Sequence, residues 1–171
     1  MRSKSYKKES EAKTVEEARE RKHGKIARQY FEEGYNCSQS VFLAFGEEYG
    51  IEPDLALKLA SSFGGGMGRL REVCGAVSGM FMAAGMLYGY TDPKDHNAKT
   101  EHYKRIQYLA KKFEEKNGSI VCRELLGLDK KKDSPQPELR TAEYYKKRPC
   151  AELVEIAAQI LEEYMQAHTF S

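Results

Sequence analysis

The chain has 171 residues, with 28 Lys and Arg against 26 Asp and Glu, and a formal net charge of +2. This length favours one domain with a hydrophobic core of its own, and the balanced charge argues against a dedicated nucleic-acid-binding protein. Residues 1–28 are rich in Lys, Arg and Glu and lack the apolar stretch of a secretory signal. We therefore expect a cytoplasmic protein with a charged N-terminal segment, residues 1–28, and one domain, residues 29–171.

No segment alternates apolar and polar residues with a period of two, so the sequence predicts an all-α fold. The first predicted helix runs over about residues 14–33, so that the charged N-terminal segment is helical from about residue 14. Asn36 and Gln39 have the spacing of a capping box, which predicts a second helix over about residues 37–49. Pro53 can open a third helix because the first helical position does not need its missing N–H.

The glycine run 64–68 predicts a loop, because adjacent glycines disfavour a helix. A fourth helix, about residues 71–88, is apolar on all sides, so we expect it at the centre of a bundle of about six helices. Residues 73–91 carry no charge, but their glycines dilute the hydrophobicity, and we expect no membrane span. After it we expect a long polar helix over about residues 95–116 and a short helix over about residues 120–126. A charged connection containing two prolines, about residues 127–142, then leads to a last helix over about residues 148–166.

The four cysteines all fall at or near the start of a predicted helix: Cys37, Cys74, Cys122 and Cys150. A helix N-terminus carries partial positive charge and free N–H groups, and both favour a thiolate over a thiol. A cysteine that only fills space in a core has no reason to prefer these positions, although free cysteines are often buried. Because no C-x-x-C motif is present, any joint site must be assembled by the fold.

Three interpretations of the cysteines stay open. Thiolates could pass electrons through a mixed disulfide, with Cys74 as the nucleophile activated by Arg71, Cys37 as its partner, and Cys122 and Cys150 as a second pair or as resolving thiols. Such a protein would be a thiol/disulfide oxidoreductase or an electron-transfer accessory protein. The same four thiolates could instead hold zinc or an iron–sulfur cluster, although the lack of a close-spaced pair weakens this alternative. If the cysteines only pack, the chain is a helical interaction module, and such helical chains often form homodimers.

The glycine run and its neighbours form a second candidate site. Its backbone N–H groups and the two adjacent arginines could cradle an anion, and two further glycines would let a ligand or a backbone approach closely. A tightly bent connector is the alternative, and the spacing is neither a Walker motif nor a dinucleotide fingerprint. The candidate cofactor-binding residues are Gly64, Gly65, Gly66, Gly68, Arg69, Arg71, Gly75 and Gly79.

The histidines and the short basic runs are expected at the surface. His23, His96, His102 and His168 lie near predicted helix ends or on polar faces, which favours solvated side chains. The run Lys146-Lys147-Arg148 is too short to define a nucleic-acid surface and is expected to be a solvated chain end.

The cysteine order resembles that of a family of redox-active proteins named for its C…GCAxxG…C…C pattern. The matching residues are Cys37 within residues 35–39, the run Cys74-Gly75-Ala76-Val77-Ser78-Gly79, and then Cys122 and Cys150. The resemblance covers about residues 27–161, and the chain departs from the pattern by reading Cys-Gly-Ala where the family name reads Gly-Cys-Ala. It implies a small helical protein with redox-active cysteines and an oxidoreductase or a transport system as protein partner. It implies no particular reaction.

Overall fold

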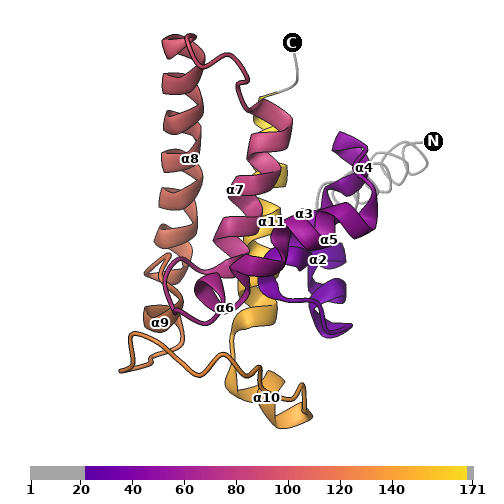
Figure 1. Ribbon diagram of the computed structural model, residues 1–171, viewed down its shortest axis with the longest axis vertical. Coiled ribbons are helices and arrows are strands. Elements are labelled where there is room, and N and C mark those ends of the chain that lie inside the picture. Colours follow the sequence, from indigo (N-terminus) through magenta and orange to yellow (C-terminus); the bar gives the residue numbers. More distant parts are fainter. Residues whose placement is uncertain (1–21, 169–171) are drawn as a thin grey trace, which may run out of the picture.

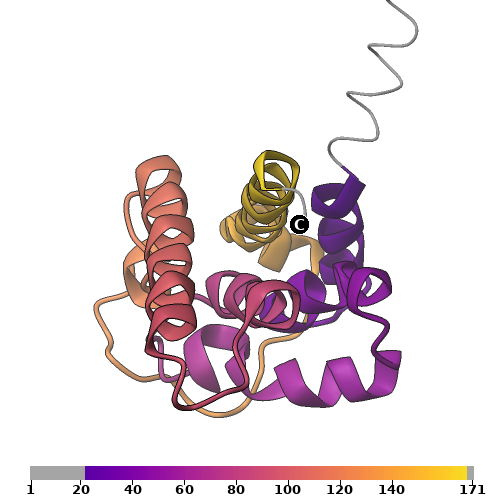
Figure 2. The same ribbon diagram turned by 90° about the horizontal axis from the view of Figure 1, so that it is seen from above.

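The computed structural model of the protein describes residues 22–168. These residues form helices and no strand, apart from one isolated bridge, so the predicted all-α fold is confirmed (Figures 1 and 2). The helices of eight or more residues are α2 (Lys22–Glu32), α3 (Cys37–Ala44), α5 (Pro53–Ala60), α7 (Gly75–Tyr88), α8 (His96–Asn117) and α11 (Cys150–Ala167). Shorter helical segments lie between them: α4 (Gly46–Tyr49), η1 (Ser61–Phe63), α6 (Gly64–Met67), α9 (Cys122–Leu125) and α10 (Ala142–Lys147).

The N-terminal helices follow the capping signals of the sequence. The capping box is present, because Asn36 Oδ1 accepts the Gln39 N–H at 2.9 Å and Gln39 Oε1 accepts the Asn36 N–H at 3.1 Å. The predicted second helix is divided at the fully buried Phe45, where the backbone leaves the helical conformation with φ −103° and ψ 10°. The part of the first predicted helix before residue 22 lies outside the described residues. α2 is continuous across residue 28, and the division of the chain there stays a prediction.

The core lies where α2, α3, α7 and α11 pack against one another, and α8 covers α7 and α11 from one side (Figure 2). Its largest fully buried side chains are Phe31, Phe42, Phe45, Met80, Leu109, Phe113 and Leu161. α7 lies very close to α3: a Cβ at Gly79 would stand 2.6 Å from the Ser38 carbonyl oxygen. The predicted central helix is therefore present, although α11 shares the centre of the bundle and Met86, near the end of α7, is half exposed.

α7 begins four residues later than predicted. Before it, residues 71–74 pair with residues 120–123: the Cys74 N–H donates to the Ile120 carbonyl at 2.8 Å, the Cys122 N–H donates to the Glu72 carbonyl at 2.6 Å, and Val73 bridges Val121. The same pairing shortens the predicted helix 120–126 to α9. Both helices start only where this backbone pairing ends.

α10 is a helix that the sequence analysis missed. It fills the interval between the predicted connection and the last helix, and the Thr141 side chain caps it by accepting the Tyr144 N–H at 3.2 Å. Within residues 22–168, no helix is long and apolar enough to cross a membrane, which agrees with the expectation of no span.

Candidate functional site

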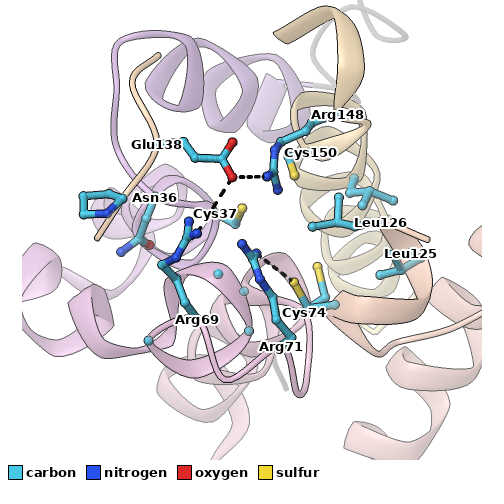
Figure 3. Close-up of a pocket in the computed structure, with 18 of the residues that line it drawn as sticks. Asn36, Cys37, Arg69, Arg71, Cys74, Leu125, Leu126, Glu138, Arg148 and Cys150 are labelled. Carbon is cyan, nitrogen blue, oxygen red and sulfur yellow. Dashed lines mark hydrogen bonds and ion pairs between the residues drawn. The ribbon is translucent and has the colours of Figure 1, made fainter. Parts of the chain in front are cut away.

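Four helix starts converge on one pocket. α3, α9 and α11 begin at Cys37, Cys122 and Cys150, and Cys74 is the residue immediately before α7. All four cysteines line a single pocket of about 290 Å³. Figure 3 shows Cys37, Cys74 and Cys150 around it, at or just before the starts of three different helices. The fold thus brings together sulfur atoms that lie far apart in the sequence.

Cys37 and Cys150 form the most closely coupled pair of the pocket. Both are free thiols that line the pocket, Cys150 is 9% exposed, and the pKa of each sulfur depends on the other. The interaction with Cys37 lowers the pKa of Cys150 against the effect of burial, and Arg148, Arg140 and Arg71 lower it further. The pKa of Cys37 is raised by its interaction with Cys150 and by its partial burial. The pair is therefore polarised, with the negative charge favoured on Cys150.

Cys74 and Cys122 are held in the thiol form. Burial raises the pKa of Cys74 to about 12, although the backbone N–H groups of Ala76 and Val77 oppose the shift. Burial also raises the pKa of Cys122, against a hydrogen bond from Arg71 whose Nη1 lies 3.6 Å from the sulfur (dashed in Figure 3). The sequence suggested that Arg71 acts on Cys74, but its hydrogen bond goes to Cys122. Arg71 lies beside Cys122 because residues 71–74 pair with residues 120–123.

The glycine run forms a left-handed turn. Residues 65–69 all have positive φ angles between 61° and 69°, and the Gly68 N–H donates to the Gly64 carbonyl at 2.9 Å. Three non-glycine residues in and after this turn share the conformation: Met67, Arg69 and Arg71. Such backbone is strained for residues with a Cβ and persists only when the surroundings hold it. The expected loop is thus a compact turn, and Arg69 and Arg71, in and just after it, line the pocket.

Close packing explains why three of the candidate positions are occupied by glycine. A Cβ at Gly64 would stand 2.5 Å from the Asn36 side chain, one at Gly66 2.6 Å from Cys122 Cβ, and one at Gly75 3.0 Å from Cys37 Cβ. Of the candidate cofactor-binding residues, these three line the pocket together with Gly65, Gly68, Arg69 and Arg71. Gly79 does not line it, because it lies one turn further along α7 against α3.

The segment between α9 and α10 passes over the pocket and is tied there by ion pairs. Arg69 and Arg71 bind Asp133 through Nη2, at 3.1 and 3.0 Å, and the Arg69 Nε–H donates to the Ser134 carbonyl. Glu138 forms ion pairs with both Arg69 and Arg148 (Figure 3). The predicted connection therefore forms one wall of the site.

Three further residues that were not predicted from the sequence line the pocket: Arg140, Arg148 and Glu138. The expectation of a solvated chain end at Arg148 is wrong, since this side chain is only 16% exposed and pairs with Glu138. Pro149 and Cys150 directly follow it at the start of α11, and this adjacency was the one available signal. Arg140 carries no motif around it that could have marked it.

His23 is also placed differently from the expectation of a solvated histidine. It is buried between α2, α4 and α11, where its ring stacks on Phe45 at 4.3 Å and bridges two carboxylates. Nδ1 lies 2.6 Å from Glu162 Oε1, and Nε2 contacts Glu48 Oε1. Burial disfavours the charged ring, but the hydrogen bonds to Glu162 and Glu48 outweigh burial and raise its pKa. This cluster links helices of the core and does not line the pocket.

Among residues 22–168, no group of three or more His, Cys, Asp or Glu side chains is arranged to hold a metal ion. The four cysteines lie around one pocket without forming such a group, and the zinc or iron–sulfur alternative gains no support from their arrangement.

The fold and the site define an all-α protein with a pocket lined by four cysteines. Residues 35–164, most of the chain, match the model of the family described as "Putative redox-active protein (C_GCAxxG_C_C)". The chain belongs to this family, as the resemblance read from its cysteines indicated. The match starts later and ends later than residues 27–161, and it includes all four cysteines. Neither the search of curated proteins nor the search of solved structures found a match.

Proposed function

We propose that the protein exchanges electrons through a thiol/disulfide couple formed by Cys37 and Cys150. The observation that carries this proposal is that both thiols line one pocket at the starts of α3 and α11, where their interaction lowers the pKa of Cys150 and raises that of Cys37. A thiolate beside a protonated thiol is the arrangement that thiol–disulfide exchange requires, because one sulfur attacks and the second resolves the mixed disulfide.

Cys150 is the attacking sulfur in this proposal, in place of the Cys74 that the sequence suggested. Its position at the first residue of an 18-residue helix favours the thiolate, and the nearby arginines add to this effect. Cys74 has a pKa of about 12 and stays a thiol near neutral pH. Cys37 attacks the mixed disulfide on Cys150 and completes the couple.

Cys74 and Cys122 form the second pair of the proposal. They share the pocket with Cys37 and Cys150, and burial keeps both as protonated thiols. They can pass electrons to an oxidised Cys37–Cys150 pair only after losing their protons, so we assign them the slower step of restoring it. A reducing compartment such as the cytosol suits four free thiols. An oxidoreductase or transport-system protein is the proposed exchange partner.

The proposal is tested by mapping disulfides after oxidation. The purified protein is treated with diamide, its remaining thiols are blocked at low pH, and its peptides are analysed by mass spectrometry without reduction. We expect a Cys37–Cys150 disulfide to form first, with an equilibrium in dithiothreitol redox buffers that fits a two-electron couple.

The matched controls are the single variants Cys74→Ser and Cys122→Ser, which should still form the Cys37–Cys150 disulfide. The variants Cys37→Ser and Cys150→Ser should lose the two-electron equilibrium. A protein that forms only disulfides between molecules, or joins Cys74 to Cys122 first, would contradict the proposed couple.

A further inference from the structure

The pocket contains more positive than negative charge. Four arginines line it: Arg69, Arg71, Arg140 and Arg148. The carboxylates that pair with them within residues 22–168 are Glu138, which lines the pocket, and Asp133, which does not line it and pairs with Arg69 and Arg71. Positive charge that the protein does not balance itself favours an anion in the same space.

Two of these arginines have a hydrogen-bond donor or a charge that no described residue satisfies. The side chain of Arg71 is 3% exposed, and its Nε–H has no hydrogen-bond partner among the described residues. Arg140 donates to the carbonyls of Phe31 and Tyr35 and stacks 4.3 Å from the centre of the Phe31 ring, and no carboxylate of the described residues pairs with it. A buried donor without a partner is costly and is rare in folded proteins, so a ligand that brings acceptors would satisfy the site.

We propose that the pocket binds a small disulfide that carries carboxylates, and that this compound is the oxidant of the Cys37–Cys150 pair. The inference rests on the proposed function for the electron transfer, and on the charge and size of the pocket for the substrate class. The arginines hold the carboxylates while the substrate disulfide lies beside Cys150. The pocket of about 290 Å³ suits a compound of this size as the oxidant.

The reaction proceeds by two exchanges. The Cys150 thiolate attacks one substrate sulfur, the substrate S–S bond breaks, and the first half leaves as a thiolate that takes up a proton. Cys37 then gives its proton to solvent and attacks the Cys150 sulfur, so that the Cys37–Cys150 disulfide forms and the second half leaves as a thiolate. Two electrons pass from the cysteine pair to the substrate. Cys74 and Cys122, which a dithiol of the proposed protein partner reduces again, restore the pair.

The experiment compares three disulfides of similar size and different charge: dithiodiglycolate, which is anionic, hydroxyethyl disulfide, which is neutral, and cystamine, which is cationic. Formation of the Cys37–Cys150 disulfide is followed by quenched-flow mass spectrometry, and each rate is divided by the rate of the same disulfide with mercaptoethanol. We expect the normalised rate of dithiodiglycolate to exceed that of the neutral compound about tenfold and cystamine to be slowest, with a dependence on salt.

Two pocket variants should move this ratio in opposite directions. Arg140→Gln removes a positive charge and should lower the ratio of the anionic to the neutral rate, whereas Glu138→Gln removes a negative charge and should raise it. The ratio cancels any change in the reactivity of Cys150 itself. Lys104→Gln and Glu101→Gln make the same charge changes on exposed positions of α8 that do not line the pocket, and they should leave the ratio unchanged.

Binding is measured separately from oxidation, by calorimetry with thiodiglycolate, an anionic thioether that cannot be reduced, and with the neutral thiodiethanol. We expect only thiodiglycolate to bind, also in a Cys37→Ser/Cys150→Ser variant, and binding to weaken in Arg140→Gln. Equal normalised rates for the three disulfides, or equal binding of the two thioethers, would overturn the substrate class while the Cys37–Cys150 couple stands. If no disulfide oxidises the pair but thiodiglycolate still binds selectively, the couple fails and the assignment of an anionic ligand holds.

Discussion

Cys150 shows how single side chains set the chemistry of the pocket. It is nearly buried, which by itself disfavours a thiolate, yet its pKa lies below the usual value because Cys37 interacts with it and arginines surround it. Cys74 is also a cysteine of comparable exposure, but no cation within residues 22–168 forms a hydrogen bond with it, and burial raises its pKa to about 12. The difference between the two sulfurs comes from their neighbours and not from their places in the sequence.

Replacing Arg148 should slow alkylation of Cys150. In Arg148→Gln the cation next to the sulfur is lost, so the thiolate fraction near neutral pH falls and the rate with iodoacetamide should drop several-fold. The rate at each cysteine is followed between about pH 6 and about pH 10 by peptide mass spectrometry. Lys146→Gln, an equal loss of charge at an exposed position outside the pocket, is the control. An unchanged pH profile in Arg148→Gln would contradict the role given to this side chain.

At the scale of elements, α2 is attached to α4 and α11 by a polar cluster within the core. His23 donates toward Glu48 and Glu162, and its ring stacks on Phe45 at the break between α3 and α4. Because the two carboxylates raise its pKa, the imidazolium stays paired over a wider pH range than a solvated histidine. The cluster joins elements from both ends of the described residues.

The stability that His23 supplies should fall as the pH rises. A group whose folded-state pKa is raised stabilises the fold fully below its unfolded value, about 6.5 for histidine, and loses that contribution as the pH passes its folded-state pKa. The difference in unfolding free energy between the wild type and His23→Gln should therefore be larger at about pH 6 than at about pH 9, in urea titrations. His96→Gln, at an exposed position, serves as the control. A difference that is constant or grows with pH would argue against a paired imidazolium.

Two glycines of α7 should respond in opposite ways to the same substitution. A Cβ at Gly79 would meet the Ser38 carbonyl at 2.6 Å, whereas nothing lies within 4 Å of a Cβ at Gly85. Gly79→Ala should therefore destabilise the protein by about 1–3 kcal/mol, because α7 and α3 must separate. Gly85→Ala should stabilise it by about 0.5–1 kcal/mol, through the better helix propensity of alanine. Thermal unfolding of both variants checks the pair, and a similar cost at both positions would show that α7 and α3 do not pack this closely.

At the scale of the whole molecule, the proposed disulfide would join the first residue of α3 to the first residue of α11. It would close a loop that includes most of the described fold: α5, α7 and α8 all lie between the two cysteines. A crosslink of this kind acts chiefly on the unfolded chain, whose freedom it reduces more for longer loops.

Oxidation should therefore stabilise the protein. For a loop of roughly 100 residues we expect an increase of about 3–5 kcal/mol in the free energy of unfolding, less any strain in the native state. Urea unfolding of the diamide-treated and the reduced protein measures the difference, and Cys37→Ser should abolish it. An oxidised wild type that unfolds at lower urea would show that the two helix starts must move apart to form the bond.

The sequence by itself determined the helices and the residue types of the site. Helix periodicity, the Asn36 capping box and Pro53 are local signals, so they predicted the all-α fold and most helix starts. The order of the cysteines indicated the family. These properties depend on neighbours along the chain, which the sequence displays directly.

Only the tertiary structure decided which of these residues act together. Contacts between residues far apart in the chain pair Cys37 with Cys150 and bury His23. They also place the Arg71 guanidinium against Cys122 and not against the predicted Cys74. Arg140 lines the pocket because the segment after α9 folds back over it. Arg148 lines it as well, where it pairs with Glu138 of the same segment. The physical reason is that a pKa follows from burial and from the charges nearby, and both are set by how the helices pack.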